Sequence, residues 1–237
     1  MRAISQSQIN LYKSCPYSYK LKYVDGHEPM FYDPSIMEVG RAVHDAIDNY
    51  YKHCYTKDND KAQILSLTYR YLRDNWDTTL PVEYLKKAYQ CVCNFAEFEF
   101  NNQHELATKP LTEVKIYAND IMGIIDYVDL NNQVVIDWKT NAKASLGRSY
   151  KMQAIMYKKL MMHQFDVDIK KLRFQFLFVD EFRDVNFSNP RLAEVEQDLL
   201  ASKEQIKESW RTLNFPKAPK AKNTCRWCNY RFYCKEM

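Results

Sequence analysis

The spacing of apolar residues divides the chain into a helical first half and a second half that mixes strands with helices. Val39, Val43 and Ile47 recur at helical spacing, whereas short runs rich in Val, Ile and Tyr begin near residue 111. The predicted helices are a short one capped by Ser5 or Ser7 and interrupted by Pro16, then 35–55, 58–77, 82–104, 148–165 and 189–213. The predicted strands are 111–118, 121–130, 133–139, 172–179 and 182–187. We therefore expect an α/β (α+β) fold in which helices flank a small mixed sheet.

Composition narrows the class of protein. The chain has 237 residues, which is long enough for one large domain or for one domain with a small appendage, and a composition of 46% hydrophobic and 27% charged residues is typical of a globular protein. It has only four glycines, and no two lie within ten residues of each other, so Gly-rich nucleotide-binding loops are excluded. No secretory leader and no apolar run of about 20 residues is evident, which predicts a soluble, cytoplasmic protein without membrane contact.

The net charge of +4 hides an uneven distribution. Residues 1–24, 139–159 and 215–237 carry +4, +6 and +5, so the rest of the chain carries −11. Three basic segments on an acidic protein indicate a surface for a polyanion, provided that folding brings them together. The alternative is that each segment is a solvated face that lacks acids.

Cysteine spacing indicates a metal site at the end of the chain. Cys225, Cys228 and Cys234 form a C-x2-C-x5-C pattern, one thiolate short of a closed tetrahedral site. Cys15, beside Pro16 in a basic segment, is the best fourth ligand. Four thiolates suit either zinc or an iron–sulfur cluster, and the spacing does not choose between them.

The most informative stretch is the predicted hairpin at residues 123–141. A two-residue turn at Asn131–Asn132 would pair residues whose numbers sum to 263, which places Asp126 directly opposite Asp137. Lys139 would point to the same face, because side chains alternate along a strand. The geometry depends on the turn, since a three-residue loop would change the parity.

Two opposed carboxylates destabilise a sheet unless a cation lies between them. Oxygen ligands of this kind suit Mg²⁺ or Mn²⁺, and Lys139 could hold a water or stabilise charge on a phosphoryl oxygen. The alternative is an ordinary hairpin whose aspartates are solvated or paired with lysines.

Six motifs in a fixed order resemble the RecB-like branch of the PD-(D/E)XK nuclease superfamily, especially its iron–sulfur members, the AddB-type and CRISPR-associated adaptation nucleases. The matching segments are SQSQINLYKSCPYSYKLKYV, GRAVH, GIID, VIDWKT, QAIMY and the terminal cysteine pattern. The resemblance runs nearly end to end and implies a restriction-endonuclease-like core. It also implies a single nuclease domain: 1–30 and 215–237 joined as an iron–sulfur clasp, 31–107 helical, and 108–214 the catalytic core.

The resemblance also implies roles for particular residues. Asp126 and Asp137 would bind the catalytic Mg²⁺ or Mn²⁺ with His44 and the backbone carbonyl of Trp138, and Glu113 is a further candidate carboxylate. Lys139 would position the attacking water, while Gln153 and Tyr157 would contact DNA near the scissile phosphate. The iron–sulfur ligands would be Cys15, Cys225, Cys228 and Cys234, holding a 4Fe-4S cluster, with zinc as the alternative.

The expected substrate is DNA, as single strands or duplex ends. Basic and aromatic side chains near the three segments are the candidate contacts, because lysines follow a nucleic-acid backbone and aromatic rings stack on bases. These candidates are Tyr12, Lys20, Arg41, Lys143, Arg148 and Lys151. The expected function is a metal-dependent DNA nuclease, with a possible helicase, recombinase or CRISPR integrase partner. The alternative is a non-catalytic nucleic-acid-binding subunit of a recombination, repair or CRISPR adaptation complex.

Overall fold

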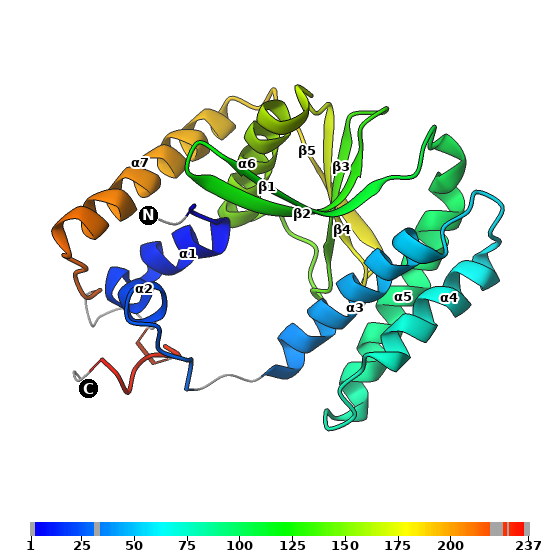
Figure 1. Ribbon diagram of the computed structural model, residues 1–237, viewed down its shortest axis with the longest axis horizontal. Helices are drawn as coiled ribbons and strands as arrows, with labels where there is room; N and C mark the ends of the chain where they lie inside the picture. Colours follow the sequence, from blue (N-terminus) through cyan, green and yellow to red (C-terminus); the bar gives the residue numbers. More distant parts are fainter. Residues whose placement is uncertain (1–2, 31–33, 219–224, 227, 235–237) are drawn as a thin grey trace.

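A computed structural model describes residues 3–30, 34–218, 225–226 and 228–234 (Figure 1). The helices are α1 (Gln6–Ser14), α2 (Pro16–Tyr23), α3 (Pro34–His53), α4 (Lys61–Asp74), α5 (Val82–Asn102), the 3₁₀ turn η1 (Gln103–Glu105), α6 (Arg148–Phe165) and α7 (Arg191–Thr212). The strands are β1 (Leu111–Ala118), β2 (Ile121–Asp129), β3 (Val134–Lys139), β4 (Lys171–Phe176) and β5 (Glu181–Val185). The predicted order of helices and strands is confirmed, and β1 and α6 have the predicted bounds. No helix within the described ranges is long and apolar enough to cross a membrane.

Local signals in the sequence explain where several helices begin. The Ser5 side chain accepts a hydrogen bond from the Gln8 amide and caps α1. Pro16 is the first residue of α2, a position where its missing N–H costs nothing. Asp60 and Gln63 form a reciprocal capping box, which starts α4 three residues later than the spacing of apolar residues predicts.

The five strands form one sheet in the order β1-β2-β3-β4-β5. The pairs β1–β2, β2–β3 and β4–β5 are antiparallel. Strands β3 and β4 are parallel and are connected through α6, as a crossover requires. The predicted mixed sheet flanked by helices is therefore confirmed, and it is consistent with a restriction-endonuclease-like core.

Helices cover the sheet from two directions, and each set has its own cluster of buried side chains (Figure 1). Val128, Val135 and Phe174 pack with α6 and α7, whereas Tyr127, Ile136 and Trp138 pack with α3 and α5. Because alternate residues of a strand face opposite sides, these two sets belong to opposite faces of the sheet. The end of β3 therefore lies between two hydrophobic cores.

The hairpin between β2 and β3 keeps the predicted register but not the predicted turn. Tyr127 pairs with Ile136 and Asp129 with Val134, so the numbers sum to 263 as expected. The loop has four residues, 130–133, rather than two. The Asp129 carboxylate accepts the amide protons of Asn131 and Asn132, and Gln133 has a φ of 56°, so the loop satisfies its own backbone groups. A four-residue loop with the same centre preserves the parity.

Candidate metal centre and active site

Three acidic residues occupy one level of the sheet on adjacent strands. The β1–β2 register aligns Glu113 with Asp126, and the β2–β3 register aligns Asp126 with Asp137. The β2–β3 ladder stops just before this level, and the β1–β2 ladder omits the Glu113–Asp126 pair before it continues at Val114–Ile125. The Trp138 amide donates a 2.7 Å hydrogen bond to Asp126 Oδ2, and Glu113 has a left-handed φ of 48°. The β2 and β3 strands therefore separate here, and the Asp126 carboxylate takes the place of a backbone acceptor.

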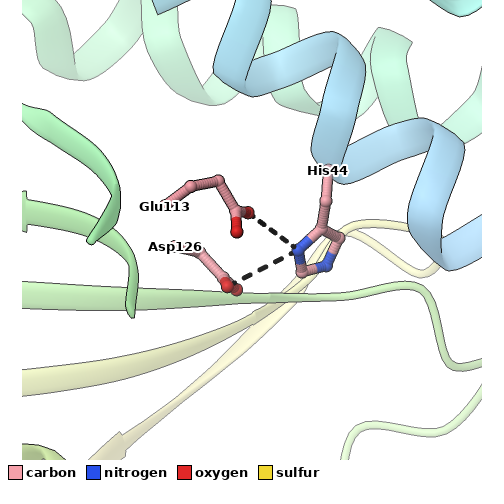
Figure 2. Close-up of side chains that lie close together, drawn as sticks. All are labelled: His44, Glu113 and Asp126. Carbon is pink, nitrogen blue, oxygen red and sulfur yellow. Dashed lines mark ion pairs between the residues drawn. The ribbon is translucent and has the colours of Figure 1, made fainter. Parts of the chain in front are cut away.

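His44 on α3 points into this opening (Figure 2). Its Nδ1 lies 3.6 Å from Glu113 Oε1 and 3.5 Å from Asp126 Oδ1. Its Nε2 donates a 3.0 Å hydrogen bond to the Trp138 carbonyl oxygen, which fixes the ring. Ligand atoms of His44, Glu113 and Asp126 all lie within 4.8 Å of one another, close enough to share one ion. In this arrangement the Trp138 carbonyl contacts His44, and its role as a metal ligand stays a prediction.

The electrostatics of His44 show how strongly this centre attracts a cation. Burial alone lowers the pKa of the imidazole, but the Asp126 charge and hydrogen bonding to Asp126 and Glu113 raise it well above its usual value. The ring is therefore protonated at neutral pH when no ion is bound. A divalent ion would take over the charge-neutralising role of that proton.

Asp137 is the centre of a second set of contacts, directly beside the first. Its carboxylate is 1% exposed, and its Oδ2 lies 2.5 Å from Lys139 Nζ. Gln153 Nε2 donates to Asp137 Oδ1 at 2.6 Å, and the Tyr157 hydroxyl lies 3.1 Å from the same oxygen. Gln153 and Tyr157 reach one carboxylate because positions i and i+4 share a face of α6.

Burial and charge act in opposite directions on this pair. Burial raises the pKa of Asp137 to about 6, although Lys139 opposes the shift. Burial lowers the pKa of Lys139, but the charges of Asp137 and Asp126 outweigh it, and the net shift is upward. Lys139 is therefore an ammonium group at neutral pH. It can orient water or stabilise an anionic oxygen, but it cannot accept a proton.

Gly123 lets α6 approach β2 closely enough to complete these contacts. A Cβ at this position would lie 2.8 Å from Leu160 Cδ1 and 3.1 Å from Tyr157 Cε1. The Tyr157 hydroxyl is also 2.6 Å from the Ile124 carbonyl oxygen on β2, so it contacts both β2 and, through Asp137, β3. In the sequence Gly123 is recognisable only as part of the GIID motif, because no local pattern reveals this packing role.

The six candidate DNA-contact residues differ in their exposure and in their ion pairs. Tyr12 is 7% exposed, and its hydroxyl lies 2.7 Å from Ser209 Oγ, so the expectation that it stacks on a base is wrong. Three of the candidate cations form ion pairs with nearby acids. These pairs are Lys20 with Asp25, Arg41 with Glu38 and Asp45, and Arg148 with Asp198. Lys143 is exposed and Lys151 partly exposed, and their contact with DNA stays a prediction.

The cysteine tail lies against the N-terminal helices, as the lower left of Figure 1 shows. The Ala218 amide donates to Cys15 Sγ at 3.4 Å, and Ser18 Oγ lies 3.3 Å from Cys228 Sγ. Among the described residues, no three cysteine sulfurs lie within 4.8 Å of one another. The sulfurs of a tetrahedral zinc site are about 3.8 Å apart, given a Zn–S bond of about 2.3 Å. A preformed zinc site is therefore not seen here, and residues 219–224, 227 and 235–237 of the predicted clasp lie outside the described ranges.

Comparison with known protein families agrees with this geometry. Residues 3–235 match the PD-(D/E)XK nuclease superfamily, and the chain therefore belongs to that superfamily. Its members are typically metal-dependent phosphodiesterases that act on nucleic acids. A search of curated proteins found no significant match.

Proposed function

We propose that the protein is a Mg²⁺- or Mn²⁺-dependent deoxyribonuclease that hydrolyses phosphodiester bonds. The observation that carries the proposal is the adjacency of two groups. Ligand atoms of His44, Glu113 and Asp126 converge within 4.8 Å, and the buried Asp137–Lys139 pair lies on the neighbouring strand. A hard cation is stabilised by carboxylates that cluster this closely, and the donor set fits one.

In this proposal Asp126, Asp137 and His44 hold the ion, and Glu113 is a further ligand. A bound divalent ion supplies Lewis-acid stabilisation of the phosphoryl oxygens. Gln153 and Tyr157 hold Asp137 in position through Oδ1. The Lys139 ammonium group lies beside the same carboxylate, where it orients the attacking water and stabilises charge that develops on the phosphate.

The test is cleavage of end-labelled linear DNA and of circular DNA under Mg²⁺ and Mn²⁺ titration. Asp137→Asn and Lys139→Ala are each expected to lower the rate at least 100-fold, because each removes a group that acts in the transition state. Asp58→Asn, an exposed acid on the far helical region, is the control and should cut normally. If the wild type degrades no DNA with either ion, the proposal is wrong. DNA binding that survives Asp126→Ala and Asp137→Ala without turnover would instead indicate a non-catalytic binding subunit.

We further propose that the chain acts as an exonuclease of the RecB-like iron–sulfur branch, with a 4Fe-4S cluster held by Cys15, Cys225, Cys228 and Cys234. The support is the docking of the tail against α2 and the backbone N–H groups of Ala218 and Tyr230, which donate to Cys15 and Cys228 at 3.4 Å. Hydrogen bonds to the cysteine sulfurs are one of the features that set the reduction potential of an iron–sulfur cluster. An iron–sulfur cluster is larger than a zinc ion and keeps its thiolates farther apart.

Two measurements address this second proposal separately. Anaerobically purified protein should be brown, with a visible absorption band and stoichiometric iron. Colourless protein that contains stoichiometric zinc would contradict the cluster. Preferential loss of end-labelled linear DNA over circular DNA supports exonuclease action, and equal loss of both contradicts it.

A further inference from the structure

Among the residues that the structure describes, none covers one face of the β1–β2 hairpin beyond the metal centre. Ile116 and Ile125 are buried toward α6 and α7. On the opposite face, Tyr117 is 52% exposed and Ile124 is 42% exposed, and apolar side chains that are exposed side by side indicate an interaction surface. In Figure 1 the hairpin extends away from α3, α4 and α5, which cover only the other end of the sheet.

The exposed side chains form one continuous patch. The register pairs Lys115 with Ile124 and Tyr117 with Met122, so the four residues are direct cross-strand neighbours. We call this patch the hairpin platform. Lys115 Nζ lies 5.4 Å from the centre of the Tyr117 ring, in position for a cation–π contact.

Charge also favours an anionic ligand on this patch. The hairpin platform contains one cation and no acid. Within the part of the chain that the structure describes, Lys115 makes no ion pair with any carboxylate. Its charge is therefore available to a phosphate, unlike that of Lys20, Arg41 or Arg148.

The hairpin platform begins where the metal centre ends. Glu113, whose carboxylate faces His44, is two residues before Lys115 on the same strand (Figure 2). Strand geometry places Tyr117 about 13 Å from Glu113 along β1. A chain whose phosphate lies at the metal centre can therefore continue directly over the hairpin platform.

We propose that the hairpin platform binds single-stranded DNA next to the scissile phosphate. Bases stack on Tyr117 and Ile124, and Lys115 pairs with a phosphate. The inference rests on the proposed nuclease function and extends it to the class of substrate. An exposed ring beside a free cation suits unpaired bases, because every base has a stacking face, whereas a duplex buries those faces within its own stack.

The test measures DNA binding in EDTA, so that no cleavage occurs, by fluorescence anisotropy. A labelled 12-nucleotide single strand is compared with a duplex of the same length. Tyr117→Ala should weaken single-strand binding about tenfold, as expected for the loss of one stacked base, and should change duplex binding less than twofold. Tyr117→Phe should retain single-strand affinity. Phe182→Ala is the matched control, since Phe182 is 49% exposed on the opposite edge strand and should have no effect.

Several results would overturn the inference. Unchanged single-strand affinity in Tyr117→Ala would mean that the patch serves some other purpose, such as contact with a protein. An equal loss for single strand and duplex would mean that the patch contacts only the DNA backbone. Circular dichroism and thermal melting establish that Tyr117→Ala is folded. Wild-type protein that fails to cut DNA, yet binds single strands through Tyr117, would contradict the nuclease proposal and leave this one intact.

Discussion

Lys139 Nζ lies 2.5 Å from Asp137 Oδ2, in surroundings where the Asp137 side chain is 1% and the Lys139 side chain 17% exposed. Two charges have thus been taken out of water together, on alternate residues of one short strand. Such a pair is weak evidence for stability, because desolvation offsets the attraction. The presence of the Asp137–Lys139 pair at the level of Glu113 and Asp126 is better explained by a role in catalysis than by a contribution to folding.

Removing one partner of this pair should be costly to stability. Lys139→Met leaves the buried Asp137 carboxylate without its counter-charge, so the free energy of unfolding should fall by about 3 kcal/mol in metal-free protein. Urea denaturation in EDTA measures this loss. The control is Lys61→Met, which breaks the exposed Lys61–Glu97 pair and should cost less than about 1 kcal/mol. Equal effects of the two substitutions would contradict the buried-pair interpretation.

Divalent ions should stabilise the folded protein, and Mn²⁺ more than Mg²⁺. The carboxylates of Glu113 and Asp126 converge only in the folded state, and the His44 nitrogen is a better ligand for a transition metal than for Mg²⁺. At an ion concentration of about 100 times Kd, the gain should be about 2.7 kcal/mol. Thermal melting with and without ions measures it. Asp126→Asn should abolish the gain, and an undiminished gain in that variant would contradict this assignment of the site.

Gly123→Ala should disturb the active site without touching any charged group. The added methyl meets Leu160 and Tyr157, and overpacking of this kind costs about 1–3 kcal/mol. Displacement of the Tyr157 ring should also lower the cleavage rate. The double variant Gly123→Ala/Leu160→Val removes the atom that lies 2.8 Å away and should recover part of the lost rate. No recovery in the double variant would mean that the effect does not pass through this contact.

Glu99 should make stability depend on pH in the direction opposite to an ordinary carboxylate. Burial raises its pKa to about 7, although the Tyr51 hydroxyl donates to it at 2.5 Å and opposes the shift. Because the folded protein holds this proton more tightly than the unfolded chain, the Glu99 contribution is present at low pH. It is lost as pH rises from about 4.5 to about 7.

Glu99→Gln isolates this contribution. The variant should be more stable than the wild type by about 2–3 kcal/mol above pH 7, and the difference should shrink toward pH 5. Chemical denaturation across this pH range measures it. Asp137, whose pKa is also raised, contributes equally to both proteins and cancels in the comparison. A difference that does not vary with pH would contradict the prediction.

The sequence predicted the strands and the register that carry the site, because both depend on local patterns of residues. A turn centred between the two asparagines was enough to set Asp126 and Asp137 at one level of the sheet. The loop is longer than predicted because Asp129 accepts the amide protons of Asn131 and Asn132, which stabilises a wider turn about the same centre. The order of residues does not show whether a side chain or the backbone accepts these amide protons, so the length of the loop could not be predicted.

What the sequence could not provide were the contacts between distant segments. The sequence neighbours of Tyr12 are basic and aromatic, which is typical of a DNA-binding segment. In the structure its hydroxyl is hydrogen-bonded to Ser209, which lies almost 200 residues later in the chain. Arg148 likewise pairs with Asp198 on another helix. The need for Gly123 arises only when α6 settles on β2. Each of these depends on tertiary packing, which no local pattern encodes.

The residues of the site belong to both hydrophobic cores at once. His44 belongs to α3, whereas Gln153 and Tyr157, which hold Asp137, belong to α6, and the strands of the sheet lie between the two helices. A small sliding of one helical layer against the other would separate the imidazole from the carboxylates while both layers remained folded. If the protein is the proposed nuclease, its activity should therefore disappear before its structure does, and loss of DNA cleavage on heating should precede loss of the helical signal.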